Sequence, residues 1–452
     1  MRSLPFLIMA LAALLVPFGY SQCTVVHMTA AQAHQRMMNL LHISSIRPGF
    51  SGSSTGPNPA NYDEAKAGPF SKIPNALVMS NGRSVATPKM WWTKRQPQLV
   101  ALFNKDIYGY VPKNTPLVHW QVVSVRYEMN GKVPVITKQL VGHVNDSRCS
   151  AIQVNIQLTL STPADAKGPV PVIMNLDLSP EVLAMFRKRF PQFFAHPPKG
   201  PTWQQQALAH GWGYASYIPA SVQPDDGAEM TEGIIGLMNR GQPRRPDQWG
   251  ALRAWAWGAS RTLDYFETDK DVDAKRVAIA GHSRYGKAAL VAMAYDQRFA
   301  AGYISSSGEG GAKLYRHIYG EGVGNLASDE LYWMAGNFMR YDGPLTVNDL
   351  PVDANELIAL CAPRPVFISG GATAAGDGWV DTKGMFLAEA NASPVYRLLG
   401  VKGLGTDLFP PIGTPLTSGT LAFRQHHQGH TPVPNFPYFM NWAARWLNAP
   451  VH

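Results

Sequence analysis

The chain has 452 residues, of which 45% are hydrophobic and 16% are charged, and it contains 41 glycines and 36 prolines. This composition is typical of a globular enzyme with many ordered turns, and it excludes a disordered or repetitive protein. The formal charge of +9 comes from Lys and Arg residues that are scattered along the chain. Because they form no basic stripe, no nucleic-acid partner is expected.

The N-terminal residues have the order of a secretory signal peptide. Arg2 precedes an apolar run from Leu4 to Phe18, which is short for a membrane span, and no later run in the sequence is longer. We therefore predict that residues 1–21 are a signal peptide, that the chain is exported to the periplasm or the medium, and that it has no membrane partner. A lipid anchor on Cys23 is less favoured, because Gln22 is not the small residue that precedes a lipidated cysteine.

The three cysteines leave two arrangements open. Cys149 and Cys361 could pair in an oxidising compartment, which would leave Cys23 over. They could equally be free and buried, since the sequence does not give their separation in space.

Residues 22–92 are rich in Ser, Gly, Pro and Asn and predict a wrapping, largely irregular extension. Residues 93–452 are expected to form one catalytic domain, which opens with a helix over residues 96–108. Three runs at residues 118–127, 136–144 and 152–160 then predict antiparallel strands at one edge of a sheet.

Strands alternate with helices in the rest of the chain. The expected strands lie at residues 169–175, 213–220, 277–281, 301–306 and 365–370, and the expected helices at residues 203–210, 247–266, 284–294 and 437–447. This alternation after an antiparallel start predicts a mostly parallel sheet with helices on both faces, which is the α/β-hydrolase fold.

The segment from Arg276 to Leu290 has the pattern of a nucleophile elbow. An apolar run is followed by Gly281-His-Ser283-Arg-Tyr-Gly286, and then by an apolar helical pattern. A serine becomes a useful nucleophile when a tight turn presents it to a base, and the two glycines allow the strand and the helix to approach closely. The spacing is Gly-x-Ser-x-x-Gly, so a structural turn remains an alternative for this motif taken alone.

A serine nucleophile needs a histidine base, which follows later in the chain in α/β-hydrolases. We favour His430, which lies on a loop before the last predicted helix, over its neighbours His426 and His427. A metal site in this cluster is not expected, because no Cys or carboxylate stands beside it at ligand spacing.

The acid that orients the histidine is expected on a loop after a late strand. Asp377 follows the strand at residues 365–370, and we favour it as the triad acid. Asp381 has a simpler role as the N-cap of a following helix. Glu309 is the rival acid, unless it is a structural carboxylate that satisfies loop amides.

Six segments, taken together and in this order, resemble the glucuronoyl esterases of carbohydrate esterase family 15 in their bacterial branch: residues 247–258, 271–277, 281–287, 307–311, 360–365 and 429–430. The resemblance covers roughly residues 90 to 447, and the ordered set is far more specific than any one motif. It implies hydrolysis of the ester between a glucuronic acid carboxyl on xylan, usually 4-O-methylated, and an alcohol of lignin.

The resemblance also implies roles for individual residues. Ser283 is the nucleophile, His430 the base, and Arg284 the cation and amide beside the oxyanion. Lys287, Glu321 and Trp379 match family positions that contact the sugar, although each could otherwise be a surface lysine, a solvated carboxylate or a packed tryptophan. The expected reaction needs no cofactor, and the chain is expected to be a monomer.

One position departs from the family. Fungal members and some bacterial members carry the triad acid where this chain has Ser306, which cannot stabilise an imidazolium as a carboxylate does. The role therefore passes to Asp377, which matches the alternative acid of the bacterial branch. Two rival functions remain: an acetyl xylan or feruloyl esterase on the same scaffold, and a polysaccharide-binding relative without catalytic activity.

Overall fold

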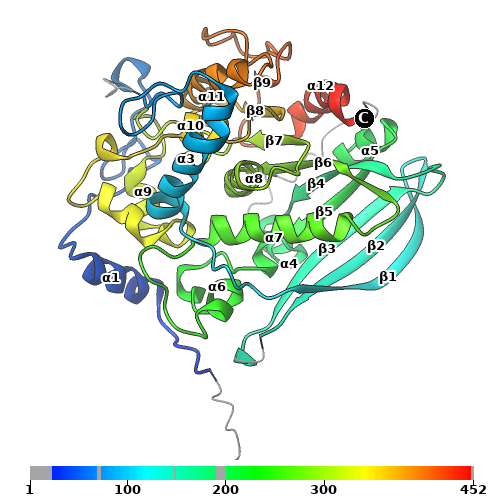
Figure 1. The fold of residues 1–452 in the computed structure, drawn as a ribbon, viewed down its shortest axis with the longest axis horizontal. Coiled ribbons are helices and arrows are strands. Elements are labelled where there is room, and N and C mark those ends of the chain that lie inside the picture. The colour runs from blue at the N-terminus through cyan, green and yellow to red at the C-terminus, as the bar shows by residue number, and fades with distance from the viewer. Residues whose placement is uncertain (1–22, 69–72, 147–148, 190–199, 449–452) are drawn as a thin grey trace, which may run out of the picture.

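The computed structural model describes residues 23–68, 73–146, 149–189 and 200–448. Within these ranges, one sheet of nine strands has the order β1-β2-β3-β5-β4-β6-β7-β8-β9 (Figure 1). The strands β1, β2, β3 and β5 pair antiparallel in that order, whereas β5, β4 and β6 to β9 pair in parallel. The predicted fold class, a mostly parallel sheet with an antiparallel N-terminal edge, is confirmed.

The strands are β1 (Val118–Asn130), β2 (Val133–Val144), β3 (Val154–Pro163), β4 (Val170–Leu176), β5 (Gly213–Ile218), β6 (Val272–His282), β7 (Ala301–Ser305), β8 (Val366–Gly370) and β9 (Leu421–Gln425). The α-helices of the described ranges are α1 (Ala30–Leu41), α2 (Pro88–Met90), α3 (Gln96–Phe103), α4 (Pro180–Arg189), α5 (Trp203–Ala209), α6 (Gly233–Met238), α7 (Ala251–Phe266), α8 (Arg284–Tyr295), α9 (Val323–Ser328), α10 (Ala354–Ala359), α11 (Thr382–Leu398) and α12 (Phe436–Leu447). Strand β9 and the short helices α6, α9 and α10 were not predicted, because runs of five or six residues carry too little periodicity.

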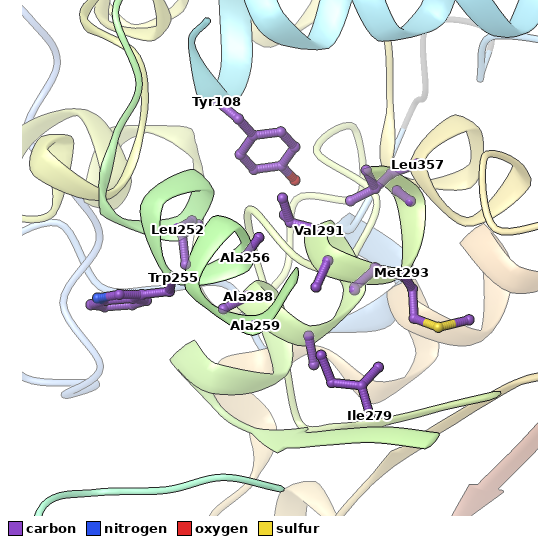
Figure 2. Packing of buried hydrophobic residues seen from close by; sticks show 14 of the residues in the cluster. Tyr108, Leu252, Trp255, Ala256, Ala259, Ile279, Ala288, Val291, Met293 and Leu357 are labelled. Atoms are coloured by element: carbon purple, nitrogen blue, oxygen red, sulfur yellow. The ribbon is translucent and has the colours of Figure 1, made fainter. Parts of the chain in front are cut away.

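Helices cover both faces of the sheet, and strand β6 shows how the sequence arranges this. Val277 and Ile279 belong to the core cluster that includes α7 and α8, whereas Ala278 and Ala280 belong to the cluster on α5 and α12. Side chains alternate between the two faces along a strand, so one apolar run supplies both cores. Figure 2 shows Ile279 below α7 and α8, whose small residues such as Ala256 and Ala288 let the two helices approach.

The N-terminal extension contains a helix that the sequence analysis missed. Helix α1 begins after Thr29, whose hydroxyl accepts from the amide of Gln32 while the Gln32 side chain accepts from the Thr29 amide. This capping box is a sequence-level signal for a helix start. At the other end of the extension, the helical segment that leads into α3 begins at Pro88, ahead of the predicted boundary at residue 92.

The cysteine pairing differs from the pairing considered above. Cys23 and Cys149 form a disulfide, with 5.0 Å between their Cα atoms. Cys361 is free and buried just after α10, where its Sγ lies 3.8 Å from the carbonyl oxygen of Leu357. The pairing of Cys149 with Cys361 was therefore wrong, because Cys361 belongs to the core and the extension brings Cys23 to Cys149.

None of the described helices has the length and hydropathy needed to cross a bilayer.

Candidate active site

Ser283 is the single residue between the end of β6 and the start of α8, and it forms a sharp turn. Its backbone has φ 56° and ψ −131°, a left-handed φ that is rare outside glycine, and its amide donates to the carbonyl oxygen of Ser305 on β7 at 2.9 Å. A Cβ on Gly281 would clash with the carbonyl oxygen of Tyr285, and a Cβ on Gly286 would lie 2.8 Å from the Ser305 oxygen. Both glycines are therefore needed for the strand and the helix to meet at this serine.

His430 is held by Asp377. The Nδ1 atom of His430 lies 2.6 Å from Asp377 Oδ1, and the other carboxylate oxygen accepts from the Ser306 hydroxyl at 2.8 Å and the Gly371 amide at 2.5 Å. Burial alone would raise the pKa of Asp377, but the hydrogen bonds from His430, Gly371 and Ser306 and the charge of His430 together lower it below its usual value. Asp377 is 1% exposed and therefore presents a fixed, ionised acceptor.

The imidazole of His430 lies beside the elbow. Its ring centroid is 4.3 Å from that of His282, the residue before Ser283, and its side chain is 40% exposed. Because Nδ1 donates to Asp377, Nε2 is the atom left to accept a proton. In the described part of the chain, Ser283 Oγ has no hydrogen-bond partner; such contacts often tighten only when substrate binds.

The competing carboxylates have other partners. Glu309 is fully buried and forms an ion pair with Lys313, and burial raises the pKa of Glu309 to about 8 although Lys313 opposes the shift. Asp381 accepts from the Gly384 amide at 2.8 Å, so its predicted N-cap role on α11 is confirmed. The second oxygen of Asp381 lies 2.5 Å from the Nδ1 atom of His317.

The two other histidines of the C-terminal cluster do not contact Asp377 through a hydrogen bond in the described ranges. His426 bonds within its own loop, through Nε2 to the carbonyl oxygen of Thr431 and through Nδ1 to the amide of Gln428. His427 is exposed and lies next to Gly413. The described residues also hold no group of three or more His, Cys, Asp or Glu side chains that could bind a metal ion.

Arg284 follows the nucleophile and is fixed by an aspartate that the sequence analysis missed. Its Nη1 atom lies 2.5 Å from Asp225 Oδ2, and its Cζ atom lies 5.0 Å from the centre of the Trp333 ring. Burial by itself would lower the pKa of Arg284, but the charge of Asp225 and its hydrogen bond raise it. The guanidinium of the residue that follows Ser283 is therefore a permanent cation.

Lys287 and Glu321 form a buried pair one turn of α8 beyond the nucleophile. Lys287 Nζ lies 3.0 Å from Glu321 Oε2 and donates to the carbonyl oxygen of Glu309 at 2.6 Å, and the same Glu321 oxygen accepts from the Glu309 amide at 3.0 Å. The amide of Glu321 donates to the carbonyl oxygen of Trp379 at 2.8 Å. The structure thus brings the three predicted sugar-contact residues into one connected region.

The N-terminal extension packs against the segments that carry Glu321 and Trp379. The amide of Gly320 donates to the carbonyl oxygen of Asn61 at 2.9 Å, and Asn325 exchanges hydrogen bonds with the main chain of Phe50. A Cβ on Gly52 would lie 3.6 Å from the Trp379 ring. In Figure 1 the blue chain runs from α1 past α9 on its way to α3, which is consistent with these contacts.

A family model and solved structures both show similarity to this chain. Residues 244–400 match a family model described as glucuronyl esterase, fungi. The chain is 44% identical to a CE15 glucuronoyl esterase from Teredinibacter turnerae T7901, with a TM-score of 0.86 over 92% of this chain and 99% of that chain.

Two curated relatives agree with this relationship. Carbohydrate esterase MZ0003 from an unknown prokaryotic organism is 34% identical over 377 residues, which are 78% of this chain and 84% of the relative. A 4-O-methyl-glucuronoyl methylesterase from Hypocrea jecorina (strain QM6a) is 30% identical over 182 residues, which are 37% of this chain and 38% of that relative. The chain belongs to the glucuronoyl esterases of carbohydrate esterase family 15 and is a carboxylic ester hydrolase.

Proposed function

We propose that the enzyme hydrolyses the ester between a glucuronic acid carboxyl on xylan, usually 4-O-methylated, and an alcohol of lignin, through a serine acyl-enzyme. The observation that carries this proposal is the pairing of His430 with the ionised Asp377 beside a serine on a nucleophile elbow. These are the base, the orienting acid and the nucleophile of acyl transfer.

In the first step, Nε2 of His430 takes the proton of Ser283 while Oγ attacks the uronoyl carbonyl carbon. Negative charge then develops on the carbonyl oxygen, where the Arg284 guanidinium and the main-chain amide of Arg284 stabilise it. That amide opens α8 and therefore has no acceptor within the helix. Collapse of this intermediate expels the alcohol, which takes the proton from His430.

In the second step, His430 removes a proton from water, and the resulting hydroxide attacks the acyl carbon. The Ser283 ester breaks, glucuronate leaves, and the serine regains its proton from His430. Asp377 holds the imidazolium in both steps, because its carboxylate is fixed by Ser306 and Gly371 as well as by His430.

The sugar is held on the acyl side by Lys287, Glu321 and Trp379. Glu321 accepts hydrogen bonds from sugar hydroxyls, Lys287 donates to them, and Trp379 offers an apolar ring. The relative from Hypocrea jecorina carries the name 4-O-methyl-glucuronoyl methylesterase, which supports a glucuronate ester as the substrate class.

The test compares benzyl glucuronate with acetylated xylan and with feruloyl esters. We expect hydrolysis of the glucuronate ester and a loss of kcat/KM of at least about 10³-fold in Ser283→Ala. Activity on the acetyl or feruloyl esters alone would replace the glucuronate proposal. A wild-type chain that binds glucuronoxylan but hydrolyses none of the esters would identify a binding protein instead.

Export and a monomeric state complete the proposal. The Cys23–Cys149 disulfide supports an oxidising compartment, as expected for the periplasm or the medium. It also occupies the cysteine that a lipid anchor would need. Residues 1–21, the predicted signal peptide, lie outside the described residues. Mass spectrometry of the exported chain tests whether residues 1–21 are removed. Light scattering, which measures the mass of the particle in solution, tests whether the chain is a monomer.

A further inference from the structure

Asp225 lies in the loop after β5 and has no role in the steps described above. Its Oδ2 atom accepts from Arg284 Nη1 at 2.5 Å. Its Oδ1 atom accepts from the Tyr332 hydroxyl at 2.9 Å and from the indole N–H of Trp333 at 2.8 Å. Three donors from two separate segments therefore fix both oxygens of this carboxylate.

Trp333 contacts two cations at once. Its ring centre lies 5.0 Å from Arg284 Cζ and 5.6 Å from Lys287 Nζ, and the side chain is buried. Both distances fall within the range of a cation–π interaction. The Trp333 indole therefore donates its N–H to Asp225 and lies near both Arg284 and Lys287.

The two cations depend on this arrangement to different degrees. Lys287 has two further acceptors, Glu321 Oε2 and the carbonyl oxygen of Glu309. In the described ranges, Arg284 has Asp225 as its only hydrogen-bond acceptor, and its side chain is 38% exposed. A long, half-exposed side chain has considerable rotamer freedom, so Arg284 has the most to lose when its partner is removed.

We propose that Asp225 is a positioning residue that holds the Arg284 guanidinium at the oxyanion, and that Trp333 supports this cation and the sugar-binding Lys287 together. The inference rests on the role of Arg284 in the proposed function. Asp225 occupies Nη1 and leaves Nε and Nη2 to donate to the oxyanion. A cation that is already in place stabilises the developing charge without reorganisation in the transition state.

The carboxylate also has an opposing effect, because its negative charge weakens the field of Arg284 at the oxyanion. The two effects predict opposite results for Asp225→Ala. Loss of positioning lowers kcat, whereas loss of the opposing charge alone raises it. The sign of the change therefore decides between them.

The experiment is a double-mutant cycle with benzyl glucuronate as substrate, using Asp225→Ala, Arg284→Ala and the double variant. We expect Asp225→Ala to lower kcat by about 10- to 100-fold with KM within about 2-fold of wild type. In the Arg284→Ala background, the same substitution is expected to change kcat by less than about 2-fold. A merely structural role would lower kcat in both backgrounds.

Trp333→Phe and Tyr332→Phe extend the test. Trp333→Phe removes the N–H and weakens the support of both cations, so we expect kcat to fall and KM to rise. Tyr332→Phe removes one neutral donor and is expected to cost less than about 5-fold in kcat. Asp226→Ala is the matched control: this adjacent aspartate accepts from the Ala228 amide and has no contact with Arg284 among the described hydrogen bonds. Its kinetics are expected to equal those of wild type.

Two results would overturn the inference in distinguishable ways. If Arg284→Ala is impaired while Asp225→Ala keeps or exceeds the wild-type kcat, positioning by Asp225 is refuted and the proposed function stands. If Arg284→Ala itself keeps the wild-type kcat, the oxyanion step of the proposed function is wrong and the inference fails with it. Thermal unfolding of each variant shows that the compared chains are folded.

Discussion

Asp377 and Glu309 are both buried carboxylates on loops that follow parallel strands, yet they are held in opposite ways. Asp377 follows β8, and its two oxygens accept from His430, Ser306 and the Gly371 amide. Glu309 follows β7; its Oε2 atom pairs with Lys313, and its Oε1 atom is buried with no partner in the described part of the chain. The pKa of Asp377 is lowered, whereas burial raises that of Glu309 to about 8.

The difference shows that burial alone does not decide which of the two carboxylates is held as an ion. Asp377 is 1% exposed and Glu309 0%, so the loss of water is nearly equal. What differs is the number of donors, and an acid that stabilises imidazolium must stay ionised throughout the reaction. Ser306 contributes one of those donors.

The largest expected effect separates the two carboxylates by activity. Asp377→Asn keeps the shape of the side chain but removes the charge that orients His430, so we expect kcat on benzyl glucuronate to fall by about 10⁴-fold. Glu309→Gln is the matched control, and its kcat is expected to stay within about 5-fold of wild type. A large loss in Glu309→Gln with little change in Asp377→Asn would exchange the two roles.

Ser306→Ala tests whether the donors around Asp377 matter individually. The substitution removes one hydrogen bond to an ionised group, so we expect kcat to fall by about 10-fold. The measurement is kcat of Ser306→Ala in the wild-type background and in the Asp377→Asn background, where the ionised acceptor is absent. An equal loss in the two backgrounds would contradict a role for the hydrogen bond.

A further prediction concerns the pH dependence of stability, where Glu309 and Asp377 act in opposite directions. The pKa of Glu309 is raised from 4.5 to about 8 in the folded chain. The unfolded state therefore binds fewer protons between these values, and the contribution of Glu309 to the free energy of unfolding falls as the pH rises. Urea unfolding at about pH 5 and about pH 8 is expected to show a smaller fall in Glu309→Gln than in wild type.

For Asp377 the sign is reversed. Its folded-state pKa is lowered, so its contribution is present above the unfolded-state pKa near about 4 and is lost as the pH falls through the folded value. The stability difference between wild type and Asp377→Asn is therefore expected to shrink below about pH 4. A difference that grows on acidification would show that Asp377 is not held as an ion.

The sequence alone predicted the features that depend on local pattern. Alternating and continuous apolar runs gave the order of most strands, and the glycines around Ser283 gave the elbow. The position of Asp377 after a late strand placed it at the edge of the sheet where it meets His430. Asp381 was identified as an N-cap from the helical pattern that follows it.

The features that were missed depend on contacts between distant segments. Asp225 meets Arg284 and Trp333 only because loops after different strands converge, and no periodicity links these residues along the chain. The same is true of the cysteines, since 126 residues separate Cys23 from Cys149. Helix α1 is different: its capping box was present in the sequence, but the Ser, Gly and Pro content that begins at Ser44 was taken to describe the whole extension.

The segment of the extension that packs near Glu321 and Trp379 has a consequence for which substitutions the site tolerates. It makes contacts with Gly320, Asn325 and Trp379 through main-chain groups of Asn61 and Phe50 and through Gly52, while many of its other side chains face solvent. Substitutions of those solvent-facing side chains are therefore expected to leave Ser283, His430 and Asp377 in place. A change at Gly52 is different, because an added Cβ would lie 3.6 Å from the Trp379 ring.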